Sequence, residues 1–245
     1  MKIANGIYIL DISATIMGTQ SVINPTLICD SDTVILIDTG FPGQLPLIRE
    51  AMGKEGVPFD RLNTVILTHQ DIDHVGCLTN ILNELPNRVK ILAHQEEKAY
   101  IQGEKFPVKV ARLEAHLETL PKEATAFYEK MKSFYENNKP HVDITIADGE
   151  ELPYCGGITV IHTPGHTPGH ISLYIKRYKL LVAGDILQVR EGTLVKAPES
   201  SNFDEVLNAE SLKKIAPYDI ETVICYHGGI FKDEPNKRIA ELING

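Results

Sequence analysis

The chain has 245 residues, of which 43% are hydrophobic and 23% are charged, a balance typical of globular proteins. Its formal net charge of −9 argues against a partner held by phosphate neutralisation, so we expect no nucleic-acid partner. No apolar run approaches the roughly 20 residues needed to cross a bilayer, and the N-terminus lacks a signal-peptide core, so we expect no membrane partner. The four cysteines are widely spaced and form no C-x-x-C pair. These features predict a reduced, cytoplasmic protein.

Short apolar strands and helices alternate along most of the chain, which indicates an α/β (α+β) protein. Before residue 95 we predict strands at 6–13, 22–29, 34–37, 64–68 and 89–93, and helices at 45–54 and 76–85. After residue 140 we predict strands at 142–147, 158–162, 171–175, 179–183 and 222–226, and helices at 203–215 and 236–243. Because no repeat or Pro/Gly/Ser-rich linker divides the chain, we expect a single domain over residues 1–245.

Residues 95–140 differ from their surroundings because they are rich in Glu, Lys, Ala and Leu. Apolar residues such as Val110 and Leu113 recur at helical spacing, and Pro107 and Pro121 interrupt the pattern. We therefore predict an insertion of two or three helices. It could cover a binding site as a cap, pack against the body, or contact a second subunit in a homodimer.

Metal-ligating residue types concentrate in four short segments, each following a predicted strand. The candidate ligands are His69, Asp71, Asp73, His74, His166, Asp185 and His227. Because ligand sites of α/β folds lie beyond the carboxyl ends of strands, we expect the four segments to meet at one edge. Imidazole nitrogens and carboxylate oxygens together suit a divalent transition metal. Seven donors are too many for one tetrahedral ion and suit two ions that share a carboxylate.

These segments carry a family resemblance. The stretch T-H-Q-D-I-D-H-V-G at 68–76 resembles the signature of the metallo-β-lactamase superfamily, as do T-P-G-H-T-P-G-H at 163–170, A-G-D at 183–185 and Y-H-G at 226–228. The stretch I-D-T-G at 37–40 is similar to an early strand of that family. The resemblance implies a four-layer αββα sandwich with a helical insertion and a dinuclear metal site at one edge of its two sheets.

The same resemblance assigns roles to individual residues. It implies that His69, Asp71 and His166 hold the first metal, that Asp73, His74 and His227 hold the second, and that Asp185 bridges the two. It also implies that Asp38 hydrogen-bonds the ligand loop and that His170 is structural. We expect two divalent ions, zinc in the first place, with iron or manganese as alternatives.

Asp71 departs from the family pattern, which commonly has a histidine at this position. An anionic donor makes the first site harder, weakens its Lewis acidity, and favours iron or manganese more than three histidines would. A second interpretation places Asp71 outside the coordination sphere and leaves the first site vacant or weak.

The resemblance implies a metal-dependent hydrolase in which hydroxide held by two metals attacks a small lactone, ester or thioester. Asp73 would act as the catalytic residue by orienting that hydroxide. Gln188 stands where acyl-homoserine lactonases carry a tyrosine, and the 18 residues after His227 are fewer than the C-terminal region of glyoxalase II-like thioesterases. The alternative function is a di-iron redox protein of the flavodiiron type with a separate electron donor, because that group has a carboxylate at the position of Asp71.

Overall fold

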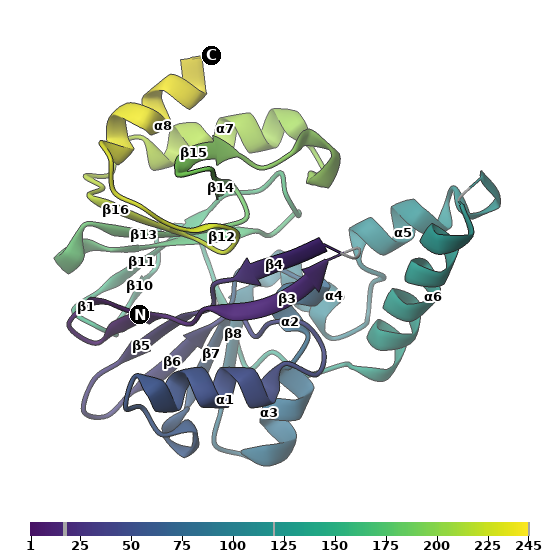
Figure 1. Ribbon diagram of the computed structural model, residues 1–245, viewed down its shortest axis with the longest axis horizontal. Helices are drawn as coiled ribbons and strands as arrows, with labels where there is room; N and C mark the ends of the chain where they lie inside the picture. Colours follow the sequence, from purple (N-terminus) through teal and green to yellow (C-terminus); the bar gives the residue numbers. More distant parts are fainter. Residues whose placement is uncertain (17–18, 120, 245) are drawn as a thin grey trace.

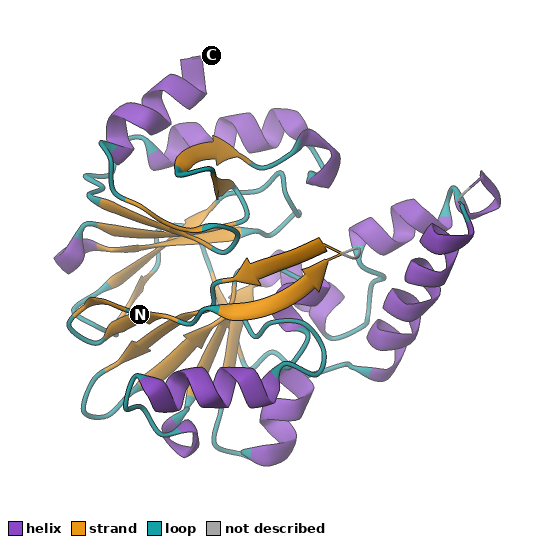
Figure 2. Cartoon of the chain, viewed as in Figure 1, coloured by secondary structure: helices purple, strands orange, loops and turns teal. Residues whose placement is uncertain are grey.

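The computed structural model describes residues 1–16, 19–119 and 121–244, and it contains two β-sheets packed face to face (Figures 1 and 2). Helices cover the outer face of each sheet (Figure 1). The predicted αββα sandwich is therefore confirmed. No helix within the described ranges combines the length and the apolar character that a membrane span requires. That residues 1–245 form a single domain stays a prediction.

The elements have the following bounds. The seven-stranded sheet contains, in spatial order, β1 (Lys2–Ala4), β2 (Ile7–Ile9), β5 (Thr26–Cys29), β6 (Val34–Ile37), β7 (Thr64–Leu67), β8 (Lys90–His94) and β9 (Ile144–Ile146). The six-stranded sheet contains β10 (Glu151–Leu152), β11 (Ile158–His162), β12 (Ile171–Ile175), β13 (Leu180–Gly184), β16 (Thr222–Cys225) and β17 (Gly229–Phe231). Two separate hairpins pair β3 (Ile12–Ile16) with β4 (Thr19–Ile23) and β14 (Leu187–Arg190) with β15 (Thr193–Lys196). The α-helices are α1 (Leu45–Lys54), α2 (Ile72–Val75), α3 (Leu78–Glu84), α4 (Gln95–Ile101), α5 (Val108–Glu114), α6 (Lys122–Asn137), α7 (Glu205–Ile215) and α8 (Pro235–Asn244).

The central strands β6 and β13 contain no polar side chain because both of their faces are covered. In β6, Val34 and Leu36 belong to the cluster that includes residues of α1 and α3, whereas Ile35 and Ile37 pack between the two sheets. The same alternation occurs in β13, whose residues pack in turn against the larger sheet and beneath α7 and α8. The sandwich thus has three apolar layers, and its middle layer holds the two sheets together.

The strand directions bring the candidate ligand segments to one edge. In the larger sheet β6, β7 and β8 are parallel. In the smaller sheet β13 and β16 are parallel, and β11 runs the same way because the antiparallel β12 lies between β11 and β13. The Ile171 N–H donates to the Thr68 carbonyl at 3.1 Å and the Asn24 N–H to the Tyr226 carbonyl at 2.9 Å, which joins the sheets where these strands end.

Two of the predicted strands are each divided into two. The stretch 6–13 contains β2 and the start of β3, and the stretch 22–29 contains the end of β4 and all of β5. At the break, the Leu10 N–H donates to the Pro25 carbonyl at 2.9 Å and the Asn24 side chain donates to Asp11 at 2.8 Å. Pro25 has no N–H to continue a ladder. The outer parts, β3 and β4, therefore leave the sheet and form their own hairpin.

The helices predicted within 95–140 are α4, α5 and α6, and α5 and α6 project from the sandwich (Figure 1). Pro107 and Pro121 stand directly before α5 and α6, as their fixed φ favours. The predicted helix at 76–85 is shorter, because α3 begins at Leu78. The hairpin of β14 and β15 was missed: its turn holds Glu191 and Gly192 at positive φ, and glutamate is not a residue that signals such a turn.

The loop before α3 is tightly packed at Gly76. A Cβ at Gly76 would lie 2.4 Å from the Gly40 carbonyl oxygen and 2.4 Å from the Pro42 nitrogen, which are backbone atoms that cannot rotate away. We predict that Gly76→Ala lowers the free energy of unfolding by at least about 2 kcal/mol in urea denaturation. Gly53→Ala is the matched control, because its Cβ meets nothing within 4 Å in α1 and should stabilise by up to about 1 kcal/mol. Equal effects at both positions would contradict this packing.

Candidate metal centre

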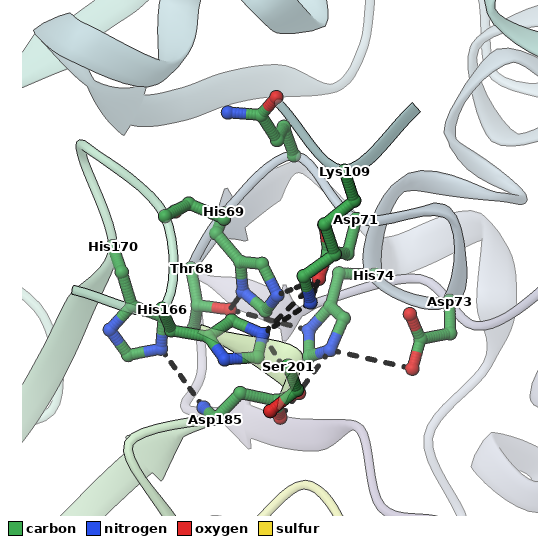
Figure 3. A network of polar contacts seen from close by, with 12 residues as sticks. Thr68, His69, Asp71, Asp73, His74, Lys109, His166, His170, Asp185 and Ser201 are labelled. Atoms are coloured by element: carbon green, nitrogen blue, oxygen red, sulfur yellow. Dashed lines mark hydrogen bonds and ion pairs between the residues drawn. The ribbon is translucent and has the colours of Figure 1, made fainter. Parts of the chain in front are cut away.

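The seven predicted donors converge at the edge where the strands end. Their ligand atoms form three overlapping groups, within each of which all atoms lie within 4.8 Å of one another: His69–Asp71–His166, His69–His74–Asp185 and Asp73–His74–His227. Figure 3 shows the imidazoles of His69, His74 and His166 pointing toward one another. We call the first of these groups the first cluster and the last the second cluster.

The orientation of three imidazoles is set by a partner at their outer nitrogen. The Nδ1 atoms of His69, His74 and His166 lie 3.0 Å from Thr68 Oγ1, 2.8 Å from Asp38 Oδ2 and 3.0 Å from Asn202 Oδ1, respectively. Such partners fix the ring and its tautomer and leave Nε2 for a metal. All three Nε2 atoms therefore face the same small volume.

The distances between donors match those around a tetrahedral ion. Asp71 Oδ2 lies 3.2 Å from His69 Nε2 and 3.2 Å from His166 Nε2. In the second cluster, Asp73 Oδ2 lies 3.6 Å from His74 Nε2 and 3.2 Å from His227 Nε2. Donors about 2.0–2.1 Å from one tetrahedral ion are separated by roughly 3.3–3.4 Å. Each cluster is therefore of the right size to hold one ion.

Asp185 borders both clusters. Its Oδ2 lies 3.5 Å from His166 Nε2 of the first cluster and 3.3 Å from His227 Nε2 of the second, and its Oδ1 lies 3.5 Å from His74 Nε2. A carboxylate in this position can contact ions in both clusters, which is the bridging role that the resemblance implies.

Several of these inward-facing atoms lack a hydrogen-bond partner. Among the described residues, His69 Nε2, His74 Nε2 and Asp185 Oδ1 are buried and make no hydrogen bond. A buried polar atom without a partner costs about 1–3 kcal/mol. Divalent cations in the two clusters would satisfy all three atoms, so the residues present fit metal ions.

Asp38 and His170 form hydrogen bonds with His74 and Asp185, two residues that carry the predicted donors. The Asp38 carboxylate accepts hydrogen bonds from the Thr68 N–H at 2.8 Å and from the Thr68 hydroxyl at 2.7 Å, besides contacting His74. The His170 Nε2 accepts from the Asp185 N–H at 2.9 Å. Gly184 has a φ of +59°, and a Cβ there would lie 2.5 Å from His170 Nε2. Glycine at this position lets the His170 ring reach the backbone N–H of Asp185.

The carboxylates of the centre raise the pKa values of His74 and His227. Burial lowers the pKa of His74, but Asp38, Asp185 and Asp73 outweigh burial and raise it well above the usual value. Burial also opposes protonation of His227, yet Asp185 and Asp73 raise its pKa to about 10. Binding of an ion to the second cluster would therefore compete with protonation of these two histidines.

Asn202 and Lys109 contact the donors directly, and sequence reasoning missed both of them. Asn202 orients His166, and Lys109 of α5 contacts Asp71 Oδ2 and places its Nζ 2.8 Å from His166 Nε2. Burial raises the pKa of the Asp71 carboxyl, but Lys109 and His69 outweigh it and hold that pKa well below its usual range. No local signal marked either residue, because both come from segments distant from the donors they contact.

Glu97 joins the two ligand loops of the first cluster. It is fully buried and accepts hydrogen bonds from Thr167 Oγ1 at 2.7 Å, the Gly169 N–H at 2.7 Å and Gln70 Nε2 at 2.9 Å. Gln70 lies beside Asp71, and Thr167 lies beside His166. One carboxylate of α4 thus connects the loops that carry these two donors.

The comparisons with known proteins identify the family of this chain. Residues 18–227 match the model of the metallo-β-lactamase superfamily, and the chain therefore belongs to that family. A probable metallo-hydrolase of Bacillus subtilis (strain 168), YflN, is 29% identical over 210 residues, which cover 79% of this chain and 75% of YflN. The uncharacterized protein YobT of the same organism is 30% identical over 71% of this chain, and the match spans 65% of YobT.

Solved structures share the fold at lower identity. A metallo-β-lactamase family protein from Thermus thermophilus is 22% identical with a TM-score of 0.75, and the match covers 98% of this chain and 79% of that chain. A metallo-β-lactamase from Pontibacter korlensis is 15% identical with a TM-score of 0.70, over 100% of this chain and 98% of that one. These likenesses bear on the architecture alone.

The burial of Glu97 predicts a pH dependence of stability. Burial raises its pKa to about 7, so the folded chain keeps a proton that the unfolded chain releases near pH 4.5. Glu97 therefore stabilises the fold less as the pH rises through this window. Between pH 5 and pH 8, we predict that the free energy of unfolding of the wild type falls by about 2 kcal/mol relative to that of Glu97→Gln. Parallel pH profiles in urea denaturation would contradict this expectation.

Proposed function

We propose that the protein is a metal-dependent hydrolase that acts on a small carbonyl substrate, such as a lactone, an ester or a thioester. Membership of the metallo-β-lactamase superfamily supports a metal-dependent hydrolase. The observation that carries the proposal most directly is the set of buried, inward-facing atoms of His69, His74 and Asp185 that have no hydrogen-bond partner in the described part of the chain.

The two clusters would hold divalent cations, and Asp185 would contact both. Divalent ions at such a site lower the pKa of a water molecule toward neutrality and polarise a carbonyl group. We propose zinc in the first place, with iron or manganese as alternatives because Asp71 is a harder donor than histidine.

Asp73 is the proposed catalytic residue. Its side chain is 15% exposed and that of His227 is 21% exposed, whereas those of His69 and His74 are fully buried. A substrate would therefore reach the centre from the second cluster. There the Asp73 carboxylate can accept a hydrogen bond from the attacking water and hold it toward the carbonyl carbon.

Exposed apolar side chains in the segment after Asn202 favour a substrate with an apolar part. Phe203 follows Asn202 directly, and its N–H donates to the His166 carbonyl at 3.2 Å. Its side chain is 46% exposed, and Val206 on the first turn of α7 is 73% exposed. Exposed apolar side chains on a segment whose backbone contacts the His166 loop would suit an acyl chain or a ring.

One observation favours a second candidate function. A carboxylate at position 71 is the feature shared with di-iron redox proteins of the flavodiiron type. Metal analysis of the purified protein separates the two candidates: zinc or manganese supports the hydrolase, whereas two irons per chain with visible absorbance support the redox protein. The cytoplasmic location and the homodimer stay predictions.

The proposed role of Asp73 predicts the behaviour of an isosteric variant. We expect Asp73→Asn to lower kcat/KM by at least about 100-fold on any nitrophenyl ester, thioester or lactone that the wild type hydrolyses, because the amide cannot accept the proton of the water. Asp233→Asn, which changes an exposed carboxylate, is the matched control and should retain wild-type rates. Full activity of Asp73→Asn would exclude the assigned role. A wild type that hydrolyses none of the panel while holding iron would point to the redox alternative.

A further inference from the structure

Lys109 places a positive charge inside the first cluster. Its Nζ contacts Asp71 Oδ2 and lies 2.8 Å from His166 Nε2 (Figure 3). Its side chain is only 28% exposed. The ammonium thus lies between two of the three donors that would hold the first ion.

The position of Lys109 is set by anchors on both sides of the cluster. At the start of α5, the Val108 N–H donates to Gln70 Oε1 at 3.1 Å, and Gln70 is the neighbour of Asp71. One turn later, Arg112 donates to the carbonyl of Asn202 at 3.0 Å, and Asn202 is the partner of His166. Because α5 is hydrogen-bonded on both sides of the first cluster, these contacts fix the position of Lys109 relative to the ligand loops.

An ammonium and a metal ion cannot use the same donors at once. The partner of His166 at Nδ1 is the side-chain amide oxygen of Asn202, so His166 carries its proton on Nδ1 and has a single lone pair on Nε2. That lone pair can accept a hydrogen bond from Lys109 or coordinate an ion, but it cannot do both. A divalent ion this close to an ammonium would also be repelled by it.

The aspartate at position 71 is consistent with this competition. A neutral histidine there would offer an ammonium a single lone pair, whereas the Asp71 carboxylate forms a charge-assisted pair with Lys109. Asp71 and Lys109 therefore belong together: the carboxylate that stands in place of a histidine binds an ammonium group of the same chain.

We propose that the Lys109 ammonium occupies the position of the first metal ion, so that the chain binds one ion tightly in the second cluster and a second ion only when Lys109 withdraws. The inference rests on the metal-binding part of the proposed function and adds that the two clusters are unequal. The helical segment that carries Lys109 thereby sets how many ions the centre holds.

Zinc stoichiometry tests the proposal without an activity assay. Purified protein is dialysed to equilibrium against buffers of increasing free zinc, and bound zinc is measured by mass spectrometry. We expect the wild type to hold one zinc per chain over a range in which Lys109→Met holds two, with the second zinc bound at least about tenfold more tightly in the variant. Lys109→Gln should repeat the result. Lys130→Met removes an exposed lysine of α6 and should behave as the wild type.

Two further variants locate the tightly bound ion. His227→Ala should lose it, whereas His166→Ala should retain it, and thermal melting verifies that each variant is folded. Two zinc ions of equal affinity in the wild type, or one zinc in both Lys109 variants, would overturn the inference and leave the proposed function standing. Absence of bound zinc, iron and manganese from the wild type would overturn the proposed function and the inference together.

Discussion

The structure depends on one electrostatic constraint: the carboxylates of Asp71, Asp73 and Asp185 lie together at a largely buried site and require positive charge. Asp71, Asp73 and Asp185 are each within 3.6 Å of an imidazole nitrogen. Buried charges of one sign are expensive unless they are paired. The Lys109 ammonium lies against Asp71. The imidazoles of His74 and His227 lie against Asp73 and Asp185, and their raised pKa values favour protonation. A metal ion would replace the protons, so metal affinity and pH are coupled at this centre.

In this fold the strands supply the apolar core, and the segments after the strands supply the metal-ligating side chains. Apolar residues that alternate between two layers hold each central strand rigidly, and the polar segments begin only where the strands end. Hydrogen bonds to Asp38, Thr68 and Asn202 then orient three of the rings. Donor atoms placed on rigid strand ends with fixed partners need little rearrangement to receive an ion.

Much of this arrangement could be predicted from the sequence because its signals are local. A short apolar strand followed by His69, Asp71 and His74 indicates both a strand end and a set of ligands, and parallel strands bring such ends together. The division of two predicted strands at Leu10 and Pro25 was not predictable in the same way. The division depends on hydrogen bonds between residues 10–11 and residues 24–25, and neither stretch of sequence alone indicates these bonds.

The contribution of the insertion could not be predicted, for a related physical reason. Periodicity indicates that residues 95–140 form helices and where prolines interrupt them, but it does not indicate where those helices dock. Lys109 lies 38 positions from Asp71 in sequence, and Glu97 lies 70 and 72 positions from Thr167 and Gly169. Such contacts arise only when α4 and α5 pack on the ligand loops. Asp71 stands where the family commonly has a histidine, and its partner Lys109 comes close to it only in the folded chain.

The most direct test of the central claim is the location of metal in crystals grown with zinc, with diffraction measured on both sides of the zinc absorption edge. We expect an anomalous peak enclosed by Asp73, His74, Asp185 and His227. Zinc found only elsewhere on the molecule, with these four side chains free of metal, would contradict it.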